Sequence, residues 1–235
     1  MLYFKSLVFA GDSKQRSPFC SQDYEPKSVL DFVEEEEDKQ DEPFIKRSFL
    51  DIQFRMQPDL GTVISDNFYD GKVRNFKKST GRKTCYFYDF KSSLIEDRGN
   101  ARNAPEEMRE AHRMAAAFTR AFPSYEIAVL TAYNAQYYFF EKLCTKRPLG
   151  VNVGCHTIDS FMGKEADVVI VCICAYEKKV RKFMRKRKRT NVALSRAKER
   201  LIVMGCLRTM ETNDMWREIL NSFDIVSSKT KQKVL

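Results

Sequence analysis

The ten residues from Ala166 to Ala175 form an almost unbroken apolar run, and this run constrains the fold more than any other segment. A strand that is open to water on one face alternates apolar and polar residues, whereas a strand covered on both faces is apolar throughout. The run is also too short to span a membrane. It is typical of a central strand in a parallel sheet with helices packed on both faces.

Strand-like and helical patterns alternate along the rest of the chain. The strand-like segments are residues 84–90, 126–130, 151–155 and 201–205, and the helical ones are 106–122, 134–143 and 214–223, with a further helical stretch at 52–68 that is broken near Pro58 and Gly61. This alternation predicts right-handed crossovers and an open parallel sheet of the α/β class. Ligands of such sheets bind in loops at the carboxyl ends of the strands. We therefore expect the functional motifs at that edge.

The run from Arg189 to Lys198 indicates phosphate handling. It predicts a short helix with an arginine in its first turns, between the strand-like runs 168–175 and 201–204. A guanidinium is permanently charged, and its rigid fork of donors matches the oxygen geometry of a phosphate. An arginine held there can reach an anion at the mouth of the sheet.

Composition narrows the class of protein. Hydrophobic residues make up 43% of the chain, which is enough for a sizeable core and unlike a disordered protein. The formal net charge of +9 suits a polyanionic partner, although many basic proteins bind no nucleic acid. The seven cysteines form no CxxC and no metal-spaced pair with a histidine, so they are interpreted as reduced core thiols rather than a metal site. With no secretory signal or membrane span in view, we expect a cytoplasmic or nuclear protein without a membrane partner.

The N-terminal fifth of the chain differs from the rest. Residues 7–10 are apolar and predict a buried strand, which Gly11 and Asp12 end. Residues 31–42 are mostly acidic, and such a block repels itself. We interpret residues 21–48 as an acidic linker or insertion, residues 49–224 as the folded domain, and residues 225–235 as a polar tail.

Five motifs follow one another in a recognisable order. They are GDSKQ at 11–15, QFRMQP at 53–58, VLTAYNAQ at 129–136, HTIDSFMGKEAD at 156–167 and RTNVALSRA at 189–197. They resemble GDxxQ, QYRMHP, VxTPYxxQ, TVDxFQGxExD and RxNVALTRA in superfamily 1 helicases, in the group of the nonsense-mediated-decay helicase and senataxin. One such motif is weak evidence, but five in order are specific.

The resemblance implies a RecA-like fold of the P-loop NTPase type for residues 49–224, the second motor domain of an ATP-dependent helicase. Residues 1–20 would supply the last strand and the GDxxQ motif of a first RecA-like domain. The cofactors implied are ATP and Mg²⁺. Arg196 resembles the arginine finger, Arg55 a second phosphate-facing arginine, and Gln15 the glutamine that senses the γ-phosphate.

Three further residues match positions near the nucleotide. Phe54 stands where the family has a tyrosine that stacks on the adenine ring, so stacking is kept and the phenolic hydrogen bond is lost. Gly163 and Glu165 resemble the loop that approaches the nucleotide, where the carboxylate can accept bonds from ribose hydroxyls. Met162 replaces the glutamine before Gly163, and its alternative placement is the core.

A separate set resembles the residues that bind single-stranded RNA or DNA, with RNA favoured. These are Thr131, Thr157 and Ser160, together with Asn191 in the last motif. Hydroxyls and free amides where strands end and helices begin can bind a phosphate backbone without reading bases. For each hydroxyl taken singly, helix capping is the commoner role.

The sequence contains no GxxxxGK[ST] loop that could cradle a triphosphate, and no strand precedes Asp41 and Glu42. We therefore expect the Mg²⁺ ligands to lie outside this chain, a first RecA-like domain to act in cis or in trans, and the chain to be inactive in isolation. It is either a fragment of a longer product or a degenerate relative. The alternative function is a non-catalytic RNA-binding or scaffolding module that keeps the fold.

The segment from Lys178 to Arg189 is strongly basic, because nine of its twelve residues are lysine or arginine. Three interpretations stay open at this point: a solvated loop, a nuclear-import signal, and a binding surface for the RNA backbone.

Overall fold

The computed structural model describes residues 8–15, 26–37, 46–93, 95–96, 102–176, 180–230 and 234. Its contacts divide the chain into two compact units, Met1–Leu50 and Asp51–Leu235. Each unit is described by itself. In the described part of the chain no helix is both long and apolar enough to cross a membrane.

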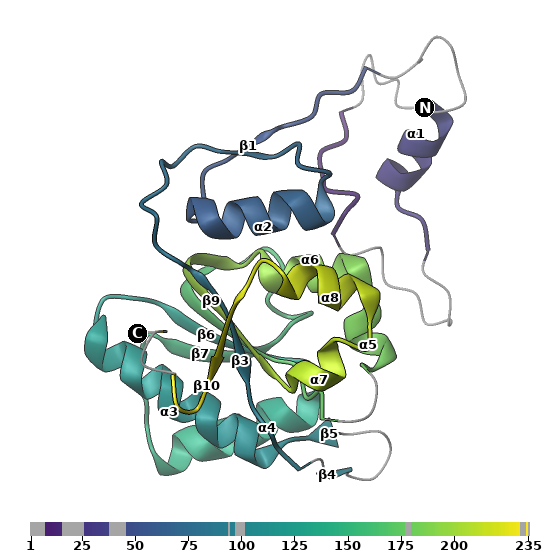
Figure 1. The fold of residues 1–235 in the computed structure, drawn as a ribbon. Coiled ribbons are helices and arrows are strands. Elements are labelled where there is room, and N and C mark those ends of the chain that lie inside the picture. Colours follow the sequence, from purple (N-terminus) through teal and green to yellow (C-terminus); the bar gives the residue numbers. More distant parts are fainter. Residues whose placement is uncertain are drawn as a thin grey trace, which may run out of the picture. The chain divides into compact units, whose positions relative to one another are not determined.

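The larger unit is built on a six-stranded parallel sheet with the strand order β10-β3-β9-β8-β6-β7 (Figure 1). Its strands are β3 (Cys85–Asp89), β6 (Ile127–Thr131), β7 (Val153–Thr157), β8 (Ala166–Cys172), β9 (Ala197–Gly205) and β10 (Asp224–Ser227). β8 lies between β9 and β6, and all its residues except Asp167 are buried. The predicted central strand and the α/β class are therefore confirmed.

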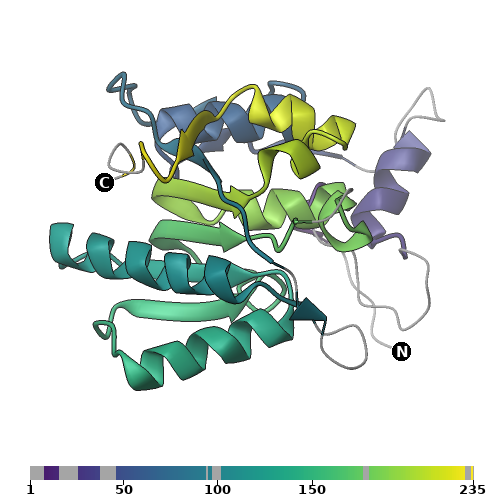
Figure 2. The ribbon, with the colours of Figure 1, turned by 60° about the horizontal axis from the view of Figure 1, so that its bottom comes forward.

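Helices cover both faces of this sheet, as predicted (Figure 2). α3 (Pro105–Ala121) and α4 (Asn134–Lys146) pack on one face through a core that includes Met108, Phe118 and Phe140. The other face is covered by α2 (Pro58–Phe68), α6 (Arg187–Leu194) and α8 (Asp214–Leu220), whose core includes Leu60 and Trp216. The two apolar layers isolate the sheet from water, and this accounts for the uniformly apolar β8.

Several short elements complete the larger unit. These are α5 (Lys182–Arg185), α7 (Leu207–Met210), the parallel pair β1 (Ile52–Gln53) and β2 (Arg74–Asn75), and the antiparallel pair β4 (Ile95–Glu96) and β5 (Arg102–Asn103). The predicted break of the helical pattern at Gly61 is wrong. α2 begins at Pro58, where a proline at the first helical position costs no hydrogen bond, and runs through Gly61 to Phe68.

Gly61 is required by a close approach rather than by a turn. A Cβ atom at this position would lie 1.9 Å from Asn75 Oδ1 and 2.6 Å from Gln53 Nε2. These two side chains hydrogen-bond to each other, with 2.7 Å between Nε2 and Oδ1, directly over the helix. The glycine thus makes room for the polar bridge that joins the segment around Gln53 to the segment around Asn75.

We expect Gly61→Ala to lower the free energy of unfolding by about 1–3 kcal/mol, because the new methyl overpacks this bridge. Urea unfolding of the wild type, Gly61→Ala, Asn75→Ala and the double variant measures the effect. The double variant should lose less than the sum of the single losses, since Asn75→Ala removes the nearest clashing atom. Strict additivity would show that the clash is not with Asn75.

The predicted polar tail from residue 225 is wrong at its start. Residues 224–227 form β10, which pairs in parallel with β3 at the edge of the sheet. An edge strand needs few apolar residues, because it has a neighbour on one side only. Here Val226 supplies the buried contact, at 2% exposed, while Ile225 is 45% exposed.

In the smaller unit the predicted strand at 7–10 does not form in its described part. Residues 8–10 have no regular structure, and Val8 and Phe9 are 88% and 52% exposed; Leu7 lies outside the described residues. A strand needs backbone partners, and none of the described strands pairs with these residues. The apolar pattern alone could not reveal that lack.

The acidic block is partly helical. α1 spans Val29–Glu37 and begins with a reciprocal cap, in which Asp31 N donates to Ser28 Oγ at 3.1 Å and Ser28 N donates to Asp31 Oδ2 at 2.8 Å. Glu34 accepts hydrogen bonds from Ser13 Oγ at 2.6 Å and Arg47 Nη2 at 2.9 Å. Partial burial opposes the charged form of Glu34, but these partners and Lys14 hold its pKa below the usual value.

Candidate functional site

Two arginines that are far apart in sequence, Arg55 and Arg196, converge on Ser195. Arg55 Nη1 donates to the Ser195 carbonyl at 3.0 Å, and Arg196 Nη2 donates to Ser195 Oγ at 2.8 Å. Arg55 also donates from Nε to Glu165 Oε2. The structure therefore brings together three residues that the sequence assigned to the nucleotide: Arg55, Arg196 and Glu165.

This arginine cluster, defined as Arg55, Glu165, Ser195 and Arg196, lies at the amino edge of the sheet. Glu165 directly precedes β8 and Arg196 directly precedes β9, and Ala166 N donates to the Arg196 carbonyl at 3.1 Å. The expectation that every motif lies at the carboxyl ends is wrong here. α6 ends at Leu194, and the chain passes through Ser195 and Arg196 into β9, so the end of the RTNVALSRA motif reaches the start of a strand.

The two guanidinium groups differ in exposure. Arg196 is only 3% exposed, and its Nε donates to the Val192 carbonyl at 3.0 Å. Arg196 thus follows α6, and Arg189 is the arginine in the first turns of that helix. The side chain of Arg55 is 33% exposed. A phosphate can meet Arg55 at the surface, whereas Arg196 is buried and donates to the Val192 carbonyl and Ser195 Oγ.

A set of hydrogen bonds holds the loop that carries Arg55. Gln53 Oε1 accepts from Met56 N at 2.7 Å, and Gln53 Nε2 donates to the Met56 carbonyl at 3.1 Å. Lys77 Nζ donates to the Arg55 carbonyl at 2.9 Å. The sequence reasoning missed Gln53 and Lys77 as supports of the site. Gln53 could have been identified, because it is the first residue of the QFRMQP motif. Lys77 belongs to no motif.

Phe54 is exposed and forms an aromatic pair. The centroid of its ring lies 4.6 Å from that of Phe76 at an angle of 38°, and the two residues are 62% and 66% exposed. Exposed large apolar groups that touch each other are typical of a binding surface. Phe76 was not identified from the sequence, because a single phenylalanine between polar residues carries no pattern.

Gly163 has a φ of +80°, in the left-handed region, and no atom lies within 4 Å of a Cβ built there. The backbone conformation of this turn therefore requires glycine at position 163. Met162, beside it, is 50% exposed, so the alternative that it faces the core is wrong.

The carboxyl edge of the sheet carries the second predicted set. Thr157 is the last residue of β7, and it caps the following turn with Ser160: Ser160 N donates to Thr157 Oγ1 at 3.2 Å, and Thr157 N donates to Ser160 Oγ at 3.1 Å. Thr157 is half-buried and Ser160 is exposed. The capping role is thus present, and both residues remain near the surface.

Thr131 and Asn191 differ from this expectation, because both are fully buried. Thr131 Oγ1 donates to the His156 carbonyl at 3.3 Å and so joins β6 to β7. Asn191 Nδ2 donates to Tyr69 Oη at 3.0 Å and so joins α6 to the end of α2. In this conformation both side chains take part in packing between elements, and their contact to nucleic acid stays a prediction.

A buried carboxyl group lies beneath the loop that follows β6. Glu107 is fully buried in α3, accepts from Gln136 Nε2 at 2.8 Å and accepts from Cys174 N at 3.3 Å. Burial raises its pKa to about 8, against the effect of these hydrogen bonds. Gln136 in turn accepts from Tyr133 N at 3.2 Å. The sequence reasoning missed Glu107, because an acidic residue in the first turn of a helix is ordinarily exposed.

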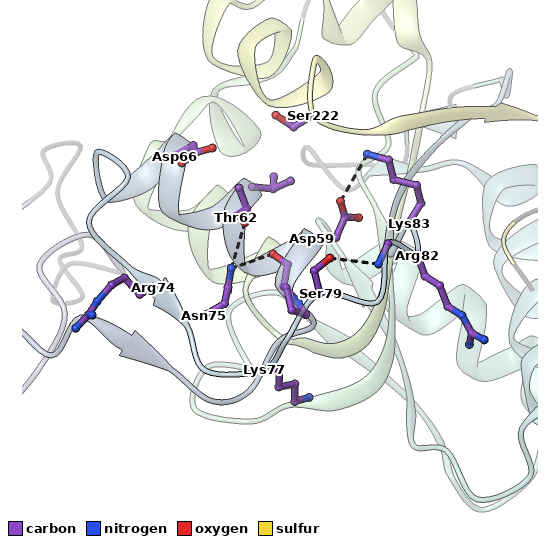
Figure 3. Close-up of a pocket in the computed structure, with 13 residues that line it drawn as sticks. Asp59, Thr62, Asp66, Arg74, Asn75, Lys77, Ser79, Arg82, Lys83 and Ser222 are labelled. Atoms are coloured by element: carbon purple, nitrogen blue, oxygen red, sulfur yellow. Dashed lines mark hydrogen bonds and ion pairs between the residues drawn. The ribbon is translucent and has the colours of Figure 1, made fainter.

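The surface beside α2 is hollowed over about 750 Å³ (Figure 3). Side chains of both charges line the hollow, and several of them bridge its two walls. Asn75 Nδ2 donates to the Pro58 carbonyl and to Thr62 Oγ1, both at 3.1 Å, and Lys83 pairs with Asp59 at 3.6 Å. A ligand site normally presents a few polar groups that converge on one point. The hollow is a seam between α2 and residues 74–83.

The larger unit thus carries the arginine cluster at the amino edge of its parallel sheet and a capped polar turn at the carboxyl edge. A family model described as an AAA domain matches residues 28–208, and the chain belongs to that family. Within it the chain belongs to the superfamily 1 helicases of the nonsense-mediated-decay and senataxin-like group, and it matches their C-terminal half. The α/β fold and the family resemblance drawn from the sequence are therefore confirmed.

Three relatives illustrate the match. The chain is 28% identical over 200 residues to Helicase sen1 of Schizosaccharomyces pombe, covering 77% of this chain and 12% of the relative. It is 26% identical over 195 residues to Regulator of nonsense transcripts 1 of Caenorhabditis elegans, covering 74% and 18%. It is 25% identical over 239 residues to DNA polymerase alpha-associated DNA helicase A of S. pombe, covering 90% and 35%. The chain thus spans a minor part of each relative.

Proposed function

We propose that this chain acts as the second motor domain of an ATP-dependent helicase and supplies Arg55 and Arg196 to ATP held by a first RecA-like domain. The observation that carries the proposal is the convergence of both guanidinium groups on Ser195 at the amino edge of the sheet. Positive charge that is fixed before the reaction stabilises the charge that develops on a transferred phosphoryl group.

The division of labour between the two domains follows from the chemistry of the residues. ATP, when bound, supplies the phosphoryl group whose transfer to water drives the cycle, and Mg²⁺ ligands and a phosphate cradle belong to the first domain. Phe54 fits the adenine ring as an exposed aromatic surface, with Phe76 at its side. Gln15 lies in the Met1–Leu50 unit, and we assign it the sensing of the γ-phosphate on its motif alone.

We propose single-stranded RNA as the nucleic acid, bound at the carboxyl edge by Thr157 and Ser160. Hydroxyls at such a turn bind the phosphates of a strand whatever its base sequence, as an enzyme that moves along nucleic acid requires. Among the relatives, the name Regulator of nonsense transcripts 1 points to transcripts, and DNA helicase A points to DNA. RNA and DNA strands of the same sequence must therefore be compared.

A second candidate function is a non-catalytic RNA-binding module. The observation that favours it is the sequence itself, which contains no GxxxxGK[ST] loop. Such a module would bind RNA with the same affinity in the presence and absence of ATP.

Adding a first RecA-like domain, fused upstream or supplied in trans, tests the proposal. We expect no ATP hydrolysis by the chain alone and hydrolysis stimulated by oligouridine when both domains are present. Hydrolysis is followed by phosphate release, and RNA affinity is measured with and without a non-hydrolysable ATP analogue. Strong RNA binding with neither hydrolysis nor any effect of the analogue would favour the non-catalytic module.

A further inference from the structure

The basic segment from Val180 to Arg189 is anchored to the body of the larger unit by two of its arginines. Arg189 donates to both carboxylate oxygens of Asp159, at 3.1 and 3.3 Å, and its guanidinium lies 4.0 Å from the centre of the Phe183 ring. Arg187 donates to the Asn67 carbonyl and lies over Phe68. These two charges are therefore used within the fold.

The short helix α5 inside this segment is held in place from below. Met184 is 1% exposed, and its carbonyl accepts hydrogen bonds from Trp216 Nε1 at 2.7 Å and from Thr190 Oγ1 at 3.3 Å. The ring of Phe183 lies 5.6 Å from that of Tyr133. A floppy solvated loop would show none of these contacts, so that interpretation of the basic block does not hold for its described part.

The anchors place α5 beside the loops of the carboxyl edge. Asp159, which receives Arg189, lies inside the turn capped by Thr157 and Ser160. Tyr133, which contacts Phe183, begins the loop-to-helix junction after β6. The basic segment and the turn proposed to bind phosphates are thus joined by direct side-chain contacts.

The outside of α5 carries basic side chains. Arg181, Lys182 and Arg185 are exposed, and the sequence from Val180 to Leu194 contains no acidic residue. A cluster of exposed cations complements a phosphodiester backbone better than a protein surface of mixed charge.

We propose that α5 is a phosphate-binding ridge for single-stranded nucleic acid, in which Arg181, Lys182 and Arg185 contact the backbone as it leaves the Thr157–Ser160 turn. The proposal rests on the proposed function, since it extends the same nucleic-acid site. Arg189 acts as a positioning residue, because its bond to Asp159 fixes the ridge against the turn.

The test measures the affinity of the chain for a fluorescent oligouridine 20-mer over a series of salt concentrations. Arg181→Ala, Lys182→Ala and Arg185→Ala are combined in one variant. Each lost phosphate contact should flatten the log-log salt dependence by about 0.7, so the combined variant should lose a slope of about 2. We expect its affinity at low salt to fall roughly tenfold or more.

A matched control removes exposed lysines from the opposite face. Lys142→Ala with Lys146→Ala lies on α4, which packs on the other side of the sheet, and is compared with Lys182→Ala with Arg185→Ala, which changes the net charge equally. The control should keep the wild-type slope. An equal loss in both pairs would overturn the proposal, because it would show that only net charge matters.

The outcomes separate this inference from the proposed function. If the wild type binds no nucleic acid at low salt, both fail. If Thr157→Ala with Ser160→Ala weakens binding and the α5 variant binds like the wild type, only the ridge fails. The last result is also the one expected if the basic segment serves an import receptor or another acidic protein.

Discussion

Arg196→Ala is expected to lower kcat for ATP hydrolysis by about 10³-fold or more in a protein that contains both RecA-like domains. The guanidinium is the group that we assign to the charge developing on the γ-phosphate, and alanine leaves nothing in its place. The KM for ATP should change much less, because an interaction made mainly in the transition state affects kcat. Steady-state phosphate release at several ATP concentrations separates the two constants.

Because Arg196 is buried, its variants need a check on folding. Arg196→Lys keeps the positive charge and loses the planar fork, so it should fold and recover only part of the activity. Arg55→Ala changes a partly exposed residue and should also lower kcat, with an effect in the double variant smaller than the product of the single effects. Arg113→Ala on α3, which removes an exposed arginine paired with Glu110, is the matched control. A fully active Arg196→Ala protein would contradict the assigned role.

The sequence was sufficient to pair Arg55 with Arg196 because each stands in a motif of a known family. It was also sufficient for β8, because a strand covered on both faces has a pattern that few alternatives share. The prediction assigned every motif to the carboxyl edge, and this failed for the end of the last motif. A crossover helix begins at the carboxyl edge of a parallel sheet and ends at the amino edge, and Arg196 lies between the end of α6 and the start of β9.

The motifs also could not predict which of their side chains are buried. Thr131 and Thr157 end neighbouring strands and have the same chemistry, yet one is fully buried and the other is half-buried. The difference arises because β6 lies inside the sheet and β7 at its edge. The order of strands is a tertiary property, and local sequence does not fix it.

Glu107 gives the second large expected effect, on stability and its pH dependence. The ordinary carboxyl pKa is 4.5, and burial raises that of Glu107 to about 8 in the folded protein. Between these values the folded chain keeps a proton that the unfolded chain has released, so stability must fall as pH rises. The stability gained from the retained proton is fully present below pH 4.5 and is lost by about pH 8. A pKa shift of this size changes the free energy of unfolding by up to roughly 5 kcal/mol across that range.

Glu107→Gln removes this titration and keeps the shape of the side chain. Gln136 Nε2 donates to one carboxylate oxygen of Glu107, and Cys174 N donates to the other. In Glu107→Gln the new amide nitrogen must therefore face one of these donors. We expect a loss of about 1–3 kcal/mol from the unsatisfied pair at low pH. As pH rises from 5 to 8, the stability of the wild type should approach that of the variant and can fall below it.

Urea unfolding of the wild type and Glu107→Gln at several values between pH 5 and 9 measures the difference, in which groups common to both proteins cancel. Glu106→Gln is the neighbouring control, because Glu106 is exposed and its pKa is lowered, chiefly by a hydrogen bond from the Ser93 backbone. Its stabilising contribution appears above the ordinary pKa and is lost as pH falls, which is the opposite sign. If the difference in unfolding free energy between wild type and Glu107→Gln stays constant between pH 5 and 9, Glu107 is charged in the folded protein over this range. A protonated Glu107 between Gln136 and Cys174 is then ruled out.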